Sequence, residues 1–261
     1  MRITARGGDG GVSNDFSHLG GGGATMSGTF EVQAGQTIRA ISGARGASDG
    51  TGGGGGGAGA VNASTNAFLL IAGGGNGAGI SDAQNASTSA RGGNGGTTDA
   101  YSGGGGGGGV NGSGANGREA NGGGQVSMTG VSAGGSGHGN GGAGMGGGGG
   151  GSFSTQGGGG GGQTGGSGHE AIPASSLPGG TCQSNTRSSN TMSPQDGYVK
   201  VELLSTITYY RDSDGDGYGD GAQTKPGPAG CTPDGYVTTN GDCNDGDASI
   251  HESKLYYVDA D

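Results

Sequence analysis

Hydrophobic residues are sparse along this chain, and where they gather they alternate with polar or small residues as in β-strands. Residues Thr25 to Val32 (TMSGTFEV) place Phe30 and Val32 on one face, and residues Gln36 to Ser42 (QTIRAIS) alternate in the same way. The short turn-like stretch Gln33 to Gly35 separates the two segments. The pattern therefore predicts a β-hairpin that can seed a sheet.

Two further segments have strand patterns. Phe68 to Ile71 (FLLI) is a short continuous apolar run, typical of a buried strand. Tyr198 to Leu204 (YVKVELL) alternates, so Val199, Val201 and Leu203 are predicted to point inward. Strands at both ends of the intervening glycine-rich stretch predict one closed unit that begins near Met1 and ends at Leu204.

Glycine dominates the sequence between these strand segments. Of 261 residues 77 are Gly, only 27% are hydrophobic and none is Trp, so the chain cannot build a core of the usual size for its length. Runs of nearly equal length suggest extended helices with three residues per turn, each spanning roughly 19 to 22 Å. Only Gly lets such helices approach closely enough to exchange backbone hydrogen bonds; the alternative is a disordered chain. The runs are Gly52–Gly57, Gly103–Gly109, Gly146–Gly151 and Gly157–Gly162.

Four stretches of the first 204 residues combine strand patterns with glycines. They are ITARGGDGG at Ile3–Gly11, GGGATMSGTFEVQAGQTI at Gly21–Ile38, FLLIAGGGNGAG at Phe68–Gly79 and DGYVKVELL at Asp196–Leu204. In these stretches the chain resembles a known family, the glycine-rich domain of secreted bacterial surface proteins, which is related to that of the anaplastic lymphoma kinase and leukocyte tyrosine kinase ectodomains. The resemblance implies a mainly β fold, a small β-sandwich or jelly-roll-like sheet that carries an inserted bundle of polyglycine II helices.

The charge distribution separates a second module from the first. Residues 1–204 hold 8 basic and 10 acidic residues, a net of −2, whereas residues 205–261 hold 3 basic and 11 acidic residues, a net of −8. The acidic module repels nucleic acid and anionic membranes, so neither is an expected partner. The alternative to metal binding is an acidic tail that only keeps the chain soluble.

The segment Tyr209 to Asp220 (YYRDSDGDGYGD) alternates carboxylates with small residues, as calcium loops do. With Asp212 as position 1, Asp214, Asp216 and Asp220 fall at positions 3, 5 and 9, and the Tyr218 carbonyl falls at position 7. Position 12 is Gln223, where the helix-loop-helix calcium loop needs a bidentate carboxylate.

Another carboxylate must therefore complete the ligand set. The available donors lie in the segment GDCNDGDASIHE, so the two halves of the module are predicted to form one calcium site or two adjacent ones. Copper would need imidazole or sulfur ligands, and only His251 is near, so calcium is preferred. The predicted donors of this second half are Asp242, Asn244, Asp245 and Asp247, with Glu252 as a further candidate.

The three cysteines point to an oxidising compartment. Cys231 and Cys243 lie in the same acidic module, which favours a local disulfide between them. Cys182 is then left over, either free or paired with a cysteine outside this segment.

The acidic segment is similar to a metal-binding motif repeated in secreted bacterial proteins, and to the aspartate-rich repeats of thrombospondins. The similarity covers Tyr209 to Ser253 through YYRDSDGDGYGD, CTPDGYV and NGDCNDGDASI. The tyrosine pair recurs at Tyr256, 47 residues after Tyr209, so residues 205–255 are expected to form one repeat and residues 256–261 the start of a truncated second one.

These features predict a structural or adhesive segment of a large secreted cell-surface protein or extracellular fibre. Its partners would be neighbouring repeats of the same chain, and the alternative function is specific binding of a surface glycan or protein. The longest apolar run, Ala67 to Ala72, is too short to span a membrane. A secreted hydrolase is the least favoured class, because no His-Asp-Ser or Cys-His constellation is evident.

Overall fold

The computed structural model describes residues 1–13, 15, 17–89, 104–152, 157–163, 165–166 and 174–251. The chain divides into two compact units, one formed by Arg2–Glu202 and the other by Leu203–Asp261 together with Met1. The described ranges contain strands β1 to β10 and no helix, so no helix there is long and apolar enough to cross a membrane. The mainly β class predicted from the sequence is confirmed.

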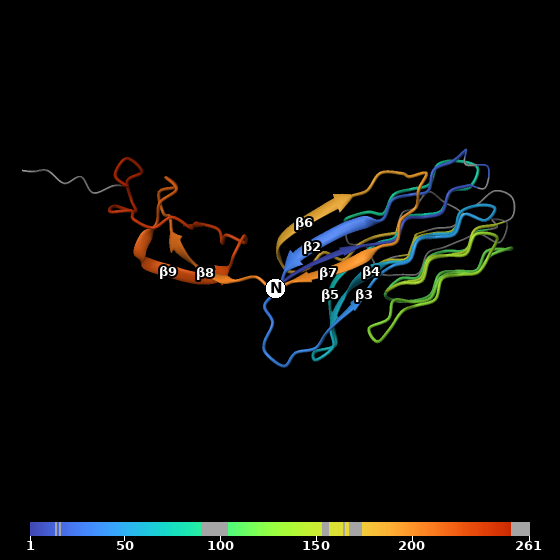
Figure 1. The fold of residues 1–261 in the computed structure, drawn as a ribbon, viewed down its shortest axis with the longest axis horizontal. Helices are drawn as coiled ribbons and strands as arrows, with labels where there is room; N and C mark the ends of the chain where they lie inside the picture. Colours follow the sequence, from blue (N-terminus) through green and yellow to red (C-terminus); the bar gives the residue numbers. More distant parts are fainter. Residues whose placement is uncertain are drawn as a thin grey trace, which may run out of the picture. The chain divides into compact units, whose positions relative to one another are not determined.

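The first unit contains a four-stranded antiparallel sheet in the order β6-β2-β1-β7 (Figure 1). Successive side chains of a strand alternate between its two faces, and in this sheet the apolar side chains of β1 and β2 fall on the inner face. Ile3 and Ala5 of β1 are fully buried, and Met26 of β2 lies opposite Ala5 in the antiparallel register. The strands are β1 (Arg2–Arg6), β2 (Ala24–Thr29), β6 (Thr181–Arg187) and β7 (Tyr198–Glu202).

A three-stranded antiparallel sheet in the order β3-β4-β5 completes the β part of this unit. Strands β1 and β2 of the first sheet pack against β4 and β5 of the second. The predicted buried strand Phe68–Ile71 is confirmed within β5, where Leu70 and Ile71 are fully buried. The strands are β3 (Ile38–Ile41), β4 (Ala58–Asn62) and β5 (Ala67–Ala72).

One hydrophobic cluster joins this sheet to the glycine-rich region. Val61 and Ile71 from the strands pack with Val126 and Met145, which are among the few large apolar residues between the glycine runs. Phe68 and three other partly buried side chains border the cluster. The glycine-rich region therefore contributes side chains to the core of the sheet.

The predicted hairpin is wrong. The turn itself forms, with the Gln36 backbone N–H donating to the Gln33 carbonyl at 3.2 Å and Gly35 at a φ of 85°. However, β2 pairs with β1 and β6, whereas β3 pairs with β4. The connection carries the chain from one sheet to the other, because each strand has its apolar partners in a different sheet.

The inward orientation predicted for Tyr198–Leu204 is also wrong in part. Val201 lies opposite Ile3 in register, but its exposed fraction is 46%, and Leu203, beyond the end of β7, is 87% exposed. The reason is that β7 is an edge strand with β1 as its single neighbour in the sheet, so packing covers it incompletely.

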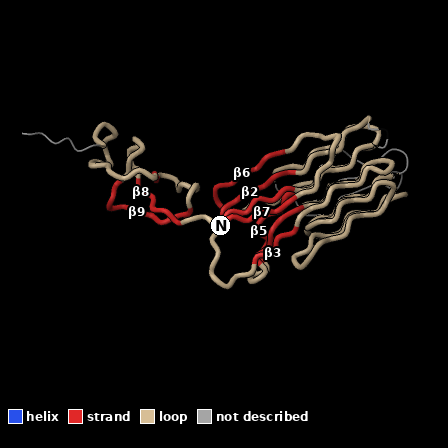
Figure 2. Tube along the Cα trace, viewed as in Figure 1, coloured by secondary structure: helices blue, strands red, loops and turns tan. Residues whose placement is uncertain are grey.

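Extended glycine-rich segments run side by side from the strand end of this unit (Figure 2). The run Gly52–Gly57 exchanges backbone hydrogen bonds with its neighbours in steps of three residues. Its N–H groups donate to Ala78 and Gly75 (from Gly52 and Gly55), to Ala47 and Ala44 (from Gly53 and Gly56), and to Gly149 and Gly146 (from Gly54 and Gly57).

The carbonyl groups of the same run repeat this period. They accept from Gly158 and Gly161, from Gly11 and Gly8, and from Gly142 and Met145, again three residues apart in each pair. One run is therefore hydrogen-bonded to six neighbouring segments. Every backbone N–H and C=O of the run has a partner, so the segment can be buried without a large side-chain core.

The second unit contains a three-stranded antiparallel sheet in the order β10-β8-β9. Its core is Tyr209 of β8, which is fully buried and donates its hydroxyl to the Pro228 carbonyl at 2.7 Å. The Cys231 backbone N–H donates to the same hydroxyl at 3.3 Å. The strands are β8 (Thr206–Arg211), β9 (Asp220–Pro228) and β10 (Tyr236–Val237).

Candidate metal centre

The loop between β8 and β9 carries the first half of the predicted calcium motif. Asp212 closes this loop on itself, because its carboxylate accepts from the Gly215 N–H at 2.7 Å and from the Gly217 N–H at 3.1 Å. Gly215 and Gly217 have φ values of 82° and 94°, which side-chain-bearing residues rarely adopt. The glycines thus allow a tight curl that turns alternate carboxylates toward one point.

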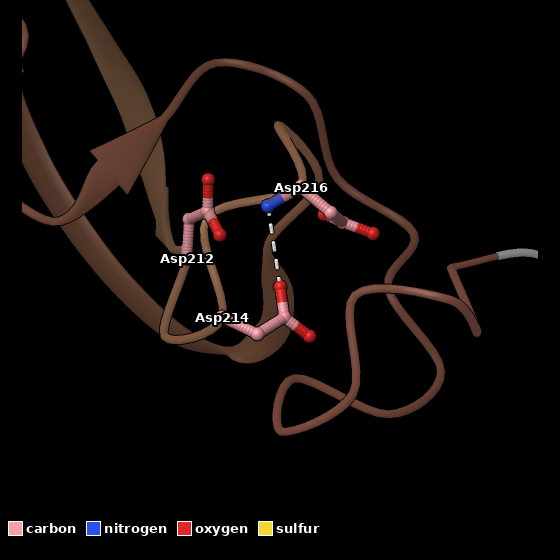
Figure 3. A group of neighbouring side chains, drawn as sticks. All are labelled: Asp212, Asp214 and Asp216. Atoms are coloured by element: carbon pink, nitrogen blue, oxygen red, sulfur yellow. Dashed lines mark hydrogen bonds between the residues drawn. The ribbon is translucent and has the colours of Figure 1, made fainter.

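Asp212, Asp214 and Asp216 form the central triad (Figure 3). Each offers one carboxylate oxygen, and these three oxygens lie within 4.8 Å of one another. The Asp214 Oδ1 accepts from the Asp216 N–H at 3.3 Å, and the Asp216 Oδ1 accepts from the Tyr218 N–H at 2.8 Å. Carboxylate oxygens gathered in this way are the ligands that hard divalent cations prefer, so the triad could hold a metal ion.

The second oxygens of two triad members have no hydrogen-bond donor in the part of the chain that the structure describes. Within the described residues, Asp214 Oδ2 and Asp216 Oδ2 are shielded from solvent and have no hydrogen-bond partner. The Asp216 side chain as a whole is only 6% exposed. A buried carboxylate oxygen without a donor is unfavourable, and a cation would satisfy it.

The electrostatics of the loop also favour a cation. The pKa of Asp214 is raised above its ordinary value, first by desolvation and then by the negative charges of Asp216, Asp242 and Asp212. A bound cation would oppose both effects by stabilising the ionised carboxylate.

The second half of the module is held beside this loop by backbone contacts. Gly219 forms a parallel β-bridge with Asn240, and the Gly219 carbonyl accepts from the Asp242 N–H at 3.2 Å. Asp242 Oδ1 accepts from the Asn244 N–H at 2.7 Å, whereas its Oδ2 is buried and has no hydrogen-bond partner among the described residues. Asp242 is the carboxylate of the second half whose negative charge raises the pKa of Asp214 in the triad.

The other predicted ligands are engaged in local hydrogen bonds. Asp220 accepts from the Ala222 N–H and from Gln223 Nε2, and these bonds lower the pKa of its carboxyl. The pKa of Asp247 is lowered by the Ser249 hydroxyl and backbone N–H.

Asp245 joins the second half of the module to the loop between β8 and β9. Its two carboxylate oxygens accept from the Ser213 N–H at 2.7 Å and the Ser213 hydroxyl at 2.6 Å, which ties the second half of the module to the loop. Of the remaining predicted donors, Asn244 lies in the adjoining turn, and Tyr218 lies two residues after Asp216. Glu252 and the expected second repeat at residues 256–261 lie outside the described residues.

His251 was not among the predicted ligands, yet its side chain lies beside the Asp triad. Its Nδ1 is 3.2 Å from Asp216 Oδ2, and its ring stacks on that of Tyr218 with centroids 4.6 Å apart and planes 10° apart. The signal for this residue in the sequence is weak, because it is a single imidazole near the end of the second half.

The predicted Cys231–Cys243 disulfide is wrong. Cys182 and Cys231 form a disulfide, and Cys243 is a free, exposed cysteine. The physical reason is that Cys231 and Cys243 lie in different environments. Cys231 is buried against Tyr209, whereas the Cys243 thiol faces the Ile250 carbonyl at 3.7 Å in a different turn.

Comparison with protein-family models gave no match, and comparison with curated proteins gave none either.

Proposed function

We propose that this chain is a structural segment of a large secreted surface protein or extracellular fibre, in which a rigid glycine-rich module is followed by a calcium-stiffened acidic repeat. The observation that carries the proposal is the three-residue period of the hydrogen bonds around Gly52–Gly57. A helix with three residues per turn points its backbone groups in three directions, and each direction recurs at every third residue.

This period supports a bundle of polyglycine II helices. Six hydrogen-bonded neighbours around one run correspond to hexagonal packing of such helices, in which backbones rather than side chains meet. A module of this kind gains rigidity from backbone hydrogen bonds and leaves few side chains for chemistry. It fits a spacer or adhesive element better than an enzyme.

Calcium is the cation we assign to the acidic repeat. The triad and Asp242 offer only hard oxygen ligands, and extracellular calcium modules work at about 10⁻⁴ to 10⁻³ M. Without a cation, carboxylates about 4 Å apart repel one another by roughly 1 to 4 kcal/mol, depending on the local dielectric constant. The repeat is then expected to be loose when calcium is absent and stiff when calcium is bound.

Chelation should loosen residues 205–261 and leave residues 1–204 folded. At ten times the dissociation constant, calcium would stabilise the repeat by about 1.4 kcal/mol, which corresponds to roughly tenfold slower cleavage through local opening. Limited proteolysis of the full chain with calcium and with excess chelator, followed by mass spectrometry of the fragments, measures this difference.

Two substitutions sharpen the experiment. Asp216→Asn removes a charge from the triad and should abolish the calcium protection. Asp234→Asn removes the charge of an exposed carboxylate elsewhere in the same unit and should leave the protection intact. Identical cleavage of the wild-type repeat with calcium and with chelator would refute the calcium role.

The second candidate function is specific binding of a glycan or protein. One observation favours it, a surface cavity of about 360 Å³ over the four-stranded sheet. Hydroxyl side chains from three strands line it, with charged groups at one end. They are Thr4, Thr25, Ser27, Ser184 and Thr186, together with Arg2, Glu202 and Cys182.

A glycan array probed with the full chain separates the two functions. Binding to one glycan class that is lost in Ser27→Val would support recognition through this cavity. Uniform absence of binding would favour the scaffold role.

A secreted location follows from the same proposal. The Cys182–Cys231 disulfide suggests an oxidising environment, since such bonds are rare in reducing compartments. A cell-surface or extracellular position would also supply the millimolar calcium that the acidic repeat needs.

A further inference from the structure

His251 and Asp216 approach each other to ion-pair distance without forming a hydrogen bond. Nδ1 of His251 and Oδ2 of Asp216 are 3.2 Å apart, yet neither atom makes a hydrogen bond to any described residue. Both atoms are shielded from solvent. Only 6% of the Asp216 side chain is exposed.

The contact is an ion pair when the imidazole is protonated. When Nδ1 is deprotonated, its lone pair faces the carboxylate oxygen, and a cation between the two atoms would relieve their repulsion. Ligand atoms about 2.0 to 2.1 Å from a tetrahedral Zn²⁺ ion are separated by roughly 3.3 Å. The observed Nδ1 to Oδ2 distance is close to this value. The pair therefore has the spacing of two ligands of one small cation.

The orientation of the imidazole is fixed by its neighbour. The His251 ring stacks on Tyr218, and the Tyr218 backbone N–H donates to the other carboxylate oxygen of Asp216. Tyr218 thus holds both the ring and the carboxylate, so that Nδ1 and Oδ2 are presented together rather than left to separate rotamers.

We infer that His251 supplies a nitrogen ligand beside the Asp triad, so that the site takes a borderline divalent cation of the Zn²⁺ class more tightly than an all-oxygen site would. Imidazole nitrogen suits Zn²⁺, whereas Ca²⁺ prefers oxygen ligands. The inference rests on the proposed metal-binding function of the repeat. It adds the second class of cation and the residue that selects it.

Isothermal titration of the full chain with ZnCl₂ and, separately, with CaCl₂ tests the inference. All proteins carry Cys243→Ser, because an exposed thiol could itself bind Zn²⁺. His251→Ala and His251→Asn should weaken Zn²⁺ binding by at least about tenfold and leave Ca²⁺ binding unchanged.

His18→Ala is the matched control. His18 Nδ1 lies 3.8 Å from Asp82 Oδ1, but both side chains are substantially exposed, so this pair should contribute nothing to Zn²⁺ affinity. A direct readout is the ¹⁵N resonance of His251 Nδ1, which should shift on addition of Zn²⁺ and stay in place on addition of Ca²⁺.

The outcomes are distinguishable. Unchanged Zn²⁺ affinity in both His251 variants would overturn the inference and leave the calcium proposal standing. Zn²⁺ binding that depends on His251 in a chain that does not bind Ca²⁺ would support the inference and overturn the calcium proposal. Loss of both cations without a Zn²⁺-dependent shift of the Nδ1 resonance would show that His251 only supports the loop, and would also overturn the inference.

Discussion

Replacing Gly54 with alanine is expected to unfold the Arg2–Glu202 unit or to lower its free energy of unfolding by more than about 4 kcal/mol. A Cβ at this position would lie far inside van der Waals contact with the Gly159 carbonyl. That carbonyl belongs to backbone rather than to a flexible side chain, so it cannot rotate away. Displacing it would also break the hydrogen bond that the Gly149 N–H donates to Gly159.

Urea unfolding monitored by circular dichroism measures the effect. Gly130→Ala is the matched control, because a Cβ there meets no atom within 4 Å. The control should change the free energy of unfolding by no more than about 0.5 kcal/mol. A Gly54→Ala protein as stable as the control would mean that the glycine runs are not packed against one another through their backbones.

The sequence predicted the elements of this fold better than their pairing. Strand segments at Phe68–Ile71 and Tyr198–Leu204 carry their own hydrophobic pattern, and β5 and β7 form there. The partner of Thr25–Val32 could not be inferred in the same way, because a turn at Gln33–Gly35 is compatible with a hairpin and equally with a crossing between two sheets. Register depends on which apolar faces meet in three dimensions.

The same limit applies to the glycine runs. Their equal lengths suggested a bundle, but identical residues carry no information about which run lies next to which. The neighbours of Gly52–Gly57 are fixed by where the flanking strands start and end, so they emerge only from the complete fold.

The candidate metal site also combines residues that the sequence could predict with residues that it could not. Asp212, Asp214 and Asp216 were predictable because their alternation with Ser213 and Gly215 lies in one short loop, where spacing alone determines proximity. Asp242 and His251 come from distant positions in the chain, and the position of His251 beside the triad was not predicted. The Cys231–Cys243 prediction was wrong for the same reason. Two cysteines in the same module need not have thiols that face each other.

Asp9 is the second position where a large effect is expected, because a single buried carboxylate there joins three segments. Its exposed fraction is 1%. Oδ1 accepts from the Gly23 N–H at 2.9 Å and from the Arg6 guanidinium at 2.5 Å, while Oδ2 accepts from the Gln195 N–H at 2.8 Å. The carboxylate therefore fixes the ends of β1, β2 and β7 at the point where the glycine-rich segments begin.

Asp9→Ala should lower the free energy of unfolding by about 3 to 5 kcal/mol, because it leaves a largely buried Arg6 and two backbone donors without their acceptor. Asp9→Asn keeps an acceptor oxygen and should lie between this variant and the wild type. The control is Asp49→Ala at an exposed position, with an expected change within about 0.5 kcal/mol. If urea unfolding gave the same midpoint for Asp9→Ala and Asp49→Ala, the carboxylate would not hold the three strand ends together, and their alignment would have to come from the glycine hydrogen bonds alone.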